Sequence, residues 1–161
     1  DKKIITDKMP LNFLYIGFIL SSFPDAKIIH IKRDAIATCW SIYKYNFQSD
    51  GNGYSHNMED LCTYYSKYFG LMGFWRDLYP NQIYDISYED LTSNQEVETR
   101  KLLDYCELQW DENCLNFHKN KRAVKTTSAL QVRQKMYQGS SEAWKKYEDY
   151  LEPLISGLKS Y

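Results

Sequence analysis

The chain has few of the residues that mark disulfide-linked, metal-binding or membrane proteins. Its 161 residues include only four cysteines, and no two of them form a CxxC pair, so we expect reduced thiols and no zinc site. The longest apolar stretch, residues 11–20, is interrupted by Asn12 and Gly17 and is too short to span a bilayer. Nothing resembles a signal peptide. These absences favour a cytoplasmic protein without a membrane partner.

The chain also lacks an excess of charge of either sign. Its 20 basic and 21 acidic residues give a net charge of −1, so no strong field attracts nucleic acid. Aromatic residues make up 16% of the chain, which is typical of a folded protein and not of a disordered one. We therefore predict a single globular domain over residues 1–161, with no nucleic-acid partner.

Segments typical of strands and helices alternate along the chain. Strands are expected at residues 4–6, 26–31 and 82–87, and helices at 10–22, 34–47, 58–78, 94–105 and 111–117, with a loop at 48–57 and two helical pieces within 131–161. This alternation predicts an α/β fold with a short parallel sheet flanked by helices and a helix-rich C-terminal half. Three strands are few for such a sheet, which suggests that upstream strands are missing. A second copy of the chain can pair with an exposed sheet edge of that kind, so the sequence is also compatible with a homo-oligomer.

For two of the expected elements, the sequence also predicts which side chains are buried. The run at residues 26–31 is rich in β-branched side chains, as in buried parallel strands. In the first helix, apolar side chains fall on one face at helical spacing. They are Leu11, Leu14, Tyr15, Phe18 and Ile19.

A basic strand end is the first candidate binding site. Residues 28–34 run from a strand into a helix start, Arg33 lies at the strand end, and Ser41 follows eight residues later. A helix N-terminus presents unpaired N–H groups, and an arginine fork suits a phosphate monoester. The alternative from these residues alone is an Arg33–Asp34 pair that caps a helix, with Ser41 exposed.

Other candidates are expected near the same sheet edge. Lys8 and Tyr88 each follow an expected strand, and ligands of open α/β sheets bind at the carboxyl ends of the strands. Tyr88 has an equally ordinary interpretation as a core or rim tyrosine. Ser128 with Gln131 three residues later forms an acceptable capping box, and a capped helix start also binds anions.

The remaining ionisable residues show no pattern of a hydrolase or metal enzyme. His30 lies in a strand and is expected to be a hydrogen-bonded core histidine. His56 is a candidate base, but lone loop histidines usually have no such role, and His118 lies in a basic stretch with no acidic partner nearby in sequence. Glu89 and Asp90 follow Tyr88 and are interpreted as structural residues, not as an acid/base pair.

Taken together, four ordered motifs resemble those of sulfotransferases. The element from Arg33 to Ser41 is similar to the family's 3′-phosphate-binding motif. Residues 6–10 and 23–27 resemble tyrosylprotein sulfotransferases and, more closely, bacterial sulfotransferases that often carry tetratricopeptide repeats. Residues 87–91 match the Tyr-Glu-Asp-Leu turn, and residues 127–133, followed by Tyr137 and Trp144, match the C-terminal donor-binding segment.

The resemblance implies a donor and roles for the motif residues. The donor is 3′-phosphoadenylyl sulfate (PAPS), and no metal is required. Arg33 and Ser41 would hold its 3′-phosphate, and Lys8 and Ser128 would stabilise charge on the transferring sulfuryl group. Other residues would line the nucleotide, namely Tyr88, Ser128, Gln131, Val132 and Arg133. The hydroxyl acceptor stays open among a protein tyrosine, a carbohydrate and a small molecule.

The chain also departs from the family pattern. Tyr45 and Ala143 stand where tyrosylprotein sulfotransferases place basic residues, which weakens the case for the same acceptor. We recognise no 5′-phosphosulfate loop and no catalytic base. The resemblance therefore implies an incomplete P-loop-NTPase-like fold, a partial sulfotransferase domain without its N-terminal strand–P-loop–helix portion, that is inactive in isolation. A non-catalytic nucleotide- or phosphate-binding module and a fragment of a P-loop small-molecule kinase are the alternatives.

Overall fold

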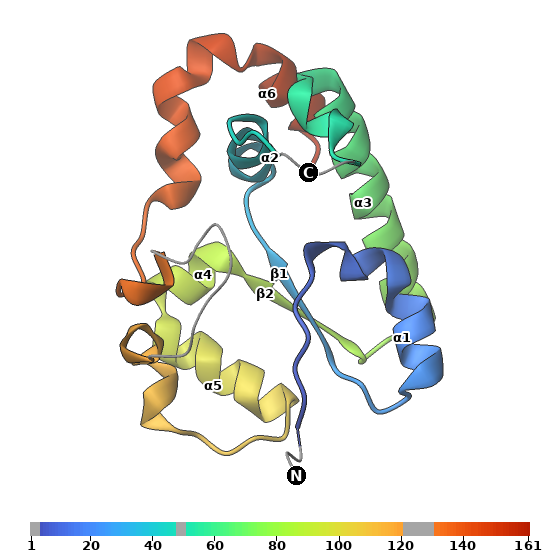
Figure 1. Ribbon diagram of the computed structural model, residues 1–161, viewed down its shortest axis with the longest axis vertical. Coiled ribbons are helices and arrows are strands. Elements are labelled where there is room, and N and C mark those ends of the chain that lie inside the picture. The colour runs from blue at the N-terminus through green and yellow to red at the C-terminus, as the bar shows by residue number, and fades with distance from the viewer. Residues whose placement is uncertain (1–3, 48–50, 121–130) are drawn as a thin grey trace.

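A two-stranded parallel sheet lies at the centre of the computed structural model, which describes residues 4–47, 51–120 and 131–161. Strand β1 (Ile28–Lys32) pairs with β2 (Ile83–Ser87) in a register that joins Ile28 to Ile83 and Lys32 to Ser87. Helices flank the two strands on both sides (Figure 1). The predicted α/β class with a short parallel sheet is confirmed.

Most of the remaining chain is helical. The α-helices are α1 (Ile16–Ser22), α2 (Ala35–Tyr43), α3 (Met58–Leu78), α4 (Tyr88–Ser93), α5 (Gln95–Tyr105) and α6 (Glu152–Leu158). The 3-10 helices are η1 (Pro10–Tyr15), η2 (Gly53–His56), η3 (Glu112–Cys114), η4 (Phe117–Lys119), η5 (Gln131–Arg133) and η6 (Ser140–Tyr150). In Figure 1, α1 and α3 lie on one side of the strands, and α4 and α5 lie on the other. No helix within the described ranges has the length and apolar character needed to cross a bilayer.

Side-chain caps fix where three of these helices begin. The Asp34 carboxylate accepts the Ala37 N–H at 2.7 Å at the start of α2. The Asn57 side chain accepts from two backbone N–H groups at the start of α3, and Ser87 does the same for one at the start of α4. Such caps satisfy N–H groups that the helix itself leaves unpaired. Because Asp34 lies two residues after β1 and Ser87 is the last residue of β2, α2 and α4 both begin at the same sheet edge.

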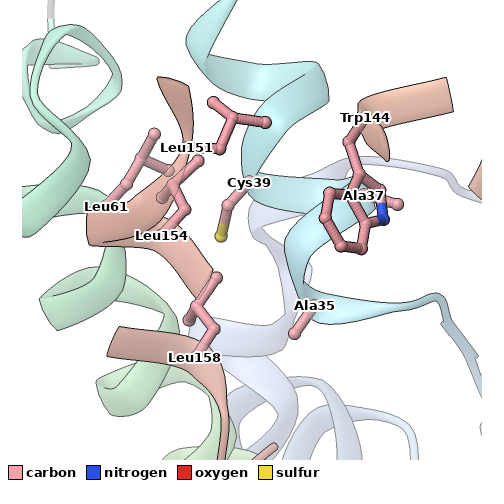
Figure 2. Close-up of a cluster of buried hydrophobic side chains, with 8 residues drawn as sticks. All are labelled: Ala35, Ala37, Cys39, Leu61, Trp144, Leu151, Leu154 and Leu158. Atoms are coloured by element: carbon pink, nitrogen blue, oxygen red, sulfur yellow. The ribbon is translucent and has the colours of Figure 1, made fainter. Parts of the chain in front are cut away.

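The main hydrophobic core joins α2, α3, η6 and α6. Figure 2 shows its buried side chains, which are Ala35, Ala37, Cys39, Leu61, Trp144, Leu151, Leu154 and Leu158. Gly157 lets α6 lie close to α3, since a Cβ at this position would be 2.7 Å from the Cys62 sulfur. A second cluster places α1 against α3. The C-terminal helices are therefore part of the core that holds α2.

The structure corrects two predictions for the N-terminal region. Residues 4–6 are not a strand, because a strand needs a hydrogen-bonded neighbour and β1 and β2 pair only with each other within the described chain. The apolar face predicted for the first helix is also wrong. Ile16 and Leu20 are the buried residues, whereas four of the five predicted ones are exposed, namely Leu11, Leu14, Tyr15 and Phe18. The first turns are 3-10 helix, whose three residues per turn shift the faces away from an α-helical pattern.

Two further differences concern burial and helix length. Strand β1 is covered on only one face, since Ile29 and Ile31 are 43% and 57% exposed. The predicted buried strand is therefore a half-exposed one. The C-terminal region is interrupted at Gly139, as predicted, where φ is 85°, but little of residues 131–139 is helical. By contrast, α3 has the predicted bounds.

A polar network ties α3 to the sheet and accounts for His30. The Nδ1 atom of His30 lies 2.6 Å from the Asp85 carboxylate on the neighbouring strand, and its Nε2 atom lies 2.5 Å from the Tyr68 hydroxyl. Because an ionised carboxylate only accepts, Nδ1 carries the proton and Nε2 accepts from Tyr68. Arg76 donates to both Asp85 oxygens, at 2.7 and 2.9 Å. His30 is thus the hydrogen-bonded core histidine that was expected.

Opposing effects set the pKa values of this network. Burial alone would raise the pKa of Asp85, but hydrogen bonds from Arg76 and His30 outweigh burial and lower it from 3.8 to about 2. Burial lowers the pKa of His30 below 6.5 despite the neighbouring Asp85. His30 is therefore neutral and Asp85 ionised in the folded protein at neutral pH.

These shifts predict a loss of stability in acid through two pH windows. Below pH 6.5 the unfolded chain protonates His30 more readily than the folded chain does, so the free energy of unfolding falls. Below about pH 4 the unfolded chain takes up a proton at residue 85 before the folded chain does, and stability falls again toward pH 2. We expect Asp85→Asn to cost about 2 kcal/mol at pH 7, since Arg76 and His30 lose a charged acceptor that is partly exposed.

Urea unfolding of the wild type and of Asp85→Asn between pH 8 and pH 3 measures how far the free energy of unfolding falls in acid. The Asp85→Asn variant should lack the part of the acid loss that arises below pH 4. The exposed carboxylate of Asp77 on α3, next to Arg76, provides the control, and Asp77→Asn should follow the wild-type curve. Equal acid losses in all three proteins would contradict the assignment.

Candidate functional site

The carboxyl ends of the two strands bring Arg33 and Tyr88 together. Lys32 and Ser87 are paired at the ends of β1 and β2. Arg33 directly follows Lys32, and Tyr88 directly follows Ser87. The guanidinium carbon of Arg33 lies 5.1 Å from the centre of the Tyr88 ring, within the range of a cation–π contact. Two residues predicted to bind the donor from separate motifs are therefore neighbours.

The start of η6 reaches the same place from the C-terminal part of the chain. The Nη2 group of Arg33 donates to the Ser140 carbonyl at 2.7 Å, and its Nε group donates to the Ser141 hydroxyl at 3.2 Å. The hydroxyls of Ser140 and Tyr88 share a hydrogen bond of 2.8 Å. Neither serine was a candidate from sequence. A glycine followed by two serines before an amphipathic segment is the local signal of a helix start, and Gly139 does precede them.

Glu89 connects these elements from the first turn of α4. Its carboxylate accepts the backbone N–H of Asp34 at 3.2 Å and a short hydrogen bond from the Ser141 hydroxyl. Burial would raise the pKa of Glu89, but these hydrogen bonds and the charge of Arg33 outweigh burial and lower it. Glu89 is therefore an ionised acceptor that joins the beginnings of α2, α4 and η6. This agrees with the structural role expected for it.

A cavity of about 160 Å³ opens beside Tyr88. Val132 from η5 also lines it, so one more of the predicted donor-binding residues shares a surface with Tyr88. The other lining residues are aromatic, long or basic, namely Phe117, Gln134, Lys135, Met136 and Tyr137. Aromatic and aliphatic walls with a nearby cation suit a nucleoside, because every base offers a flat apolar face.

The other predicted site residues are placed less favourably or are not described. Ser41 lies partly buried in the last turn of α2, about two helical turns from Arg33. Lys8 is exposed in the irregular segment before η1, so its predicted place at a strand end is wrong, because residues 4–6 form no strand. Arg133 is exposed in η5. Gln131 begins η5, and Ser128 lies outside the described residues.

A second, larger hollow lies on another side of the α2 start. It has a volume of about 460 Å³ and is lined by the first residues of α2 and by residues of α6. Its walls include Asp34, Ile36, Ile155 and Lys159. Over the ranges 4–47, 51–120 and 131–161, the structure groups no three His, Cys, Asp or Glu side chains in a way that could hold a metal ion.

Comparison with known proteins gives two results. The model of the sulfotransferase family matches residues 1–112, a range that contains Arg33, Ser41 and Tyr88. An uncharacterized protein of Aquifex aeolicus (strain VF5) is 40% identical over 157 residues, which are 96% of this chain and 21% of that protein. The chain thus spans about a fifth of the length of this relative.

Proposed function

This chain belongs to the sulfotransferase family, and on that premise we propose that it binds the 3′-phosphate end of PAPS in a protein that transfers the sulfuryl group to a hydroxyl acceptor. The observation that carries this proposal is the position of Arg33. Its guanidinium lies at a strand end against the Tyr88 ring, and Tyr88 also lines the cavity to which Val132 contributes. A phosphate on a nucleoside in that cavity would meet the arginine fork.

The remaining motif residues have proposed roles around the same donor. Ser41 would add a hydroxyl to the 3′-phosphate, and Gln131 and Arg133 would approach the nucleotide from η5. Lys8 and Ser128 would stabilise charge on the sulfuryl group as it moves between two oxygens. In this reaction a bond forms from the acceptor oxygen to sulfur while the bond from sulfur to the phosphate oxygen breaks. Adenosine 3′,5′-bisphosphate leaves, and the hydroxyl proton passes to a base that we do not assign.

Binding selectivity tests the donor assignment directly. Isothermal titration calorimetry would compare adenosine 3′,5′-bisphosphate with AMP, which differs from it only in lacking the 3′-phosphate. We expect the bisphosphate to bind at least tenfold more tightly, because a charge-assisted contact is worth about 1.5–3 kcal/mol. Equal affinities would reject the 3′-phosphate site.

An activity assay tests the transfer reaction and separates the alternatives. It would use the longest gene product that contains this chain, labelled PAPS, and a tyrosine peptide, an oligosaccharide and a small alcohol as acceptors. Transfer to one of them supports the proposal and identifies the acceptor class. Selective binding of the bisphosphate without transfer favours a non-catalytic nucleotide-binding module. Phosphorylation of an acceptor by ATP would instead support the kinase alternative.

A further inference from the structure

Arg33 is held by one edge of its guanidinium group. Its Nε and Nη2 atoms donate to the Ser141 hydroxyl and the Ser140 carbonyl, while Tyr88 covers one face of the group. Over the described residues, Nη1 has no hydrogen-bond partner. The fork formed by Nη1 and Nη2 therefore keeps donors for an anion, in an orientation that η6 and α4 set.

Glu89 determines where the proton of the Ser141 hydroxyl points. A hydroxyl has one proton, and Ser141 gives that proton to the Glu89 carboxylate. Its oxygen lone pairs then remain for the Nε–H group of Arg33. Ser141 is 8% exposed, so water has little access to compete for these bonds. The lowered pKa of Glu89 is consistent with a carboxylate that stays ionised and accepting.

The hydroxyl between Glu89 and Arg33 also has an electrostatic consequence. A direct contact with the carboxylate would pair the charge of Arg33, and no ion pair of Arg33 occurs among the described residues. With Ser141 in between, the arginine is oriented but its charge remains for a ligand. The same carboxylate holds the Asp34 N–H at the start of α2, the helix that carries Ser41.

We propose that Ser141 and Glu89 are positioning residues that orient Arg33 toward the 3′-phosphate. This inference rests on the proposed function, since it assigns the two residues to the same donor site. The proposed site then needs residues beyond 112 as well. Of the three groups that contact the guanidinium of Arg33, two come from η6 and one is the Tyr88 ring.

Replacement of the Ser141 hydroxyl tests the proposal by two measurements. The first is the ¹H–¹⁵N signal of the Arg33 Nε–H group, assigned by its loss in Arg33→Lys. In the wild type it should be slow to exchange with water, and in Ser141→Ala it should broaden or vanish. The second is calorimetry, in which Ser141→Ala should weaken binding of adenosine 3′,5′-bisphosphate about tenfold and that of AMP less than twofold. Ser141→Thr keeps the hydroxyl and should restore both results.

Glu89→Gln provides the companion test. An amide accepts a weaker hydrogen bond than a carboxylate, so the variant should weaken the same signal and reduce bisphosphate affinity several-fold. Glu142→Gln removes the charge of an exposed glutamate that pairs with Lys145 in the same helix, and it should change neither measurement. Thermal melts of each variant identify any that fail to fold, and if Ser141→Ala is one of them, Glu89→Gln carries the comparison.

The two proposals fail in distinguishable ways. If the wild type binds the bisphosphate and AMP equally, the proposed function is rejected, and the Nε–H signal still tests whether Ser141 and Glu89 orient Arg33. If the wild type discriminates but folded Ser141→Ala keeps both the protected signal and the discrimination, the positioning role is rejected and the donor site stands. A loss of affinity that is equal for both nucleotides would also reject it, since that indicates a general structural effect.

Discussion

Replacement of Arg33 by alanine is expected to weaken binding of adenosine 3′,5′-bisphosphate by about 100-fold, while the affinity for AMP changes little. The variant removes a fork that, in the proposed site, would make charge-assisted hydrogen bonds to the 3′-phosphate worth about 2–3 kcal/mol. AMP lacks the group that this fork would bind. The difference between the two nucleotides therefore isolates the contribution of Arg33 to the 3′-phosphate, and calorimetry of both proteins with both ligands measures it.

The conservative variant and a surface control sharpen this prediction. Arg33→Lys keeps the charge but loses the planar fork and the Nε–H group that Ser141 accepts, so its affinity should lie between those of the wild type and Arg33→Ala. Arg100→Ala removes an exposed arginine that pairs with Glu96 on α5 and should leave both affinities unchanged. Since Arg33→Ala also breaks two contacts to η6, its unfolding curve must be measured first. An unchanged bisphosphate affinity in the folded variant would contradict the assignment.

Local sequence signals predicted the parts of the fold that depend on local interactions. The range predicted for α3 rested on a loop at 48–57 and a long helical pattern after it, and the Asn57 cap in the structure accounts for where the helix begins. The turn from β1 into α2 follows from a β-branched run and from Asp34 as the cap. Arg33 and Tyr88 could be found because each directly follows such a strand, and parallel strands bring their carboxyl ends together.

The errors arise where distant contacts decide the outcome. Residues 4–6 have strand composition, yet a strand forms only with a partner, and composition does not reveal whether one is present. Ile16 and Leu20 are buried because α1 packs on α3 after a 3-10 start, which an α-helical periodicity cannot anticipate. Ser140 and Ser141 contact Arg33 across 107 and 108 residues of sequence. No local pattern marks such a pair.

The distant contacts also show how the C-terminal part of the chain serves the site. The family match ends at residue 112, whereas residues 140–158 supply half of the buried residues of the main core and two of the groups that contact Arg33. Cys39 and Ala37 of α2 pack against this C-terminal layer (Figure 2). The helix that carries Ser41 is therefore supported by residues outside the matched range, and the integrity of the site should depend on them.

The largest effect on stability is therefore expected at Leu154 of α6. This side chain is 0% exposed in the core between α2 and α3, and truncation of such a leucine to alanine leaves a cavity that costs about 3 kcal/mol. Leu78→Ala at the end of α3 is the matched control, because Leu78 is 52% exposed and should lose less than about 1 kcal/mol. Urea unfolding at pH 7.5 gives both values.

The same variant tests the link between this core and the site. Leu154→Ala should also increase hydrogen exchange of the α2 amides, because α6 packs directly against that helix. The amides of α5, which lies on the other side of the strands in Figure 1, should exchange at wild-type rates under conditions where the protein remains folded. If Leu154→Ala costs no more than Leu78→Ala, or if α5 loosens as much as α2, then α6 does not specifically support the helix that carries Ser41.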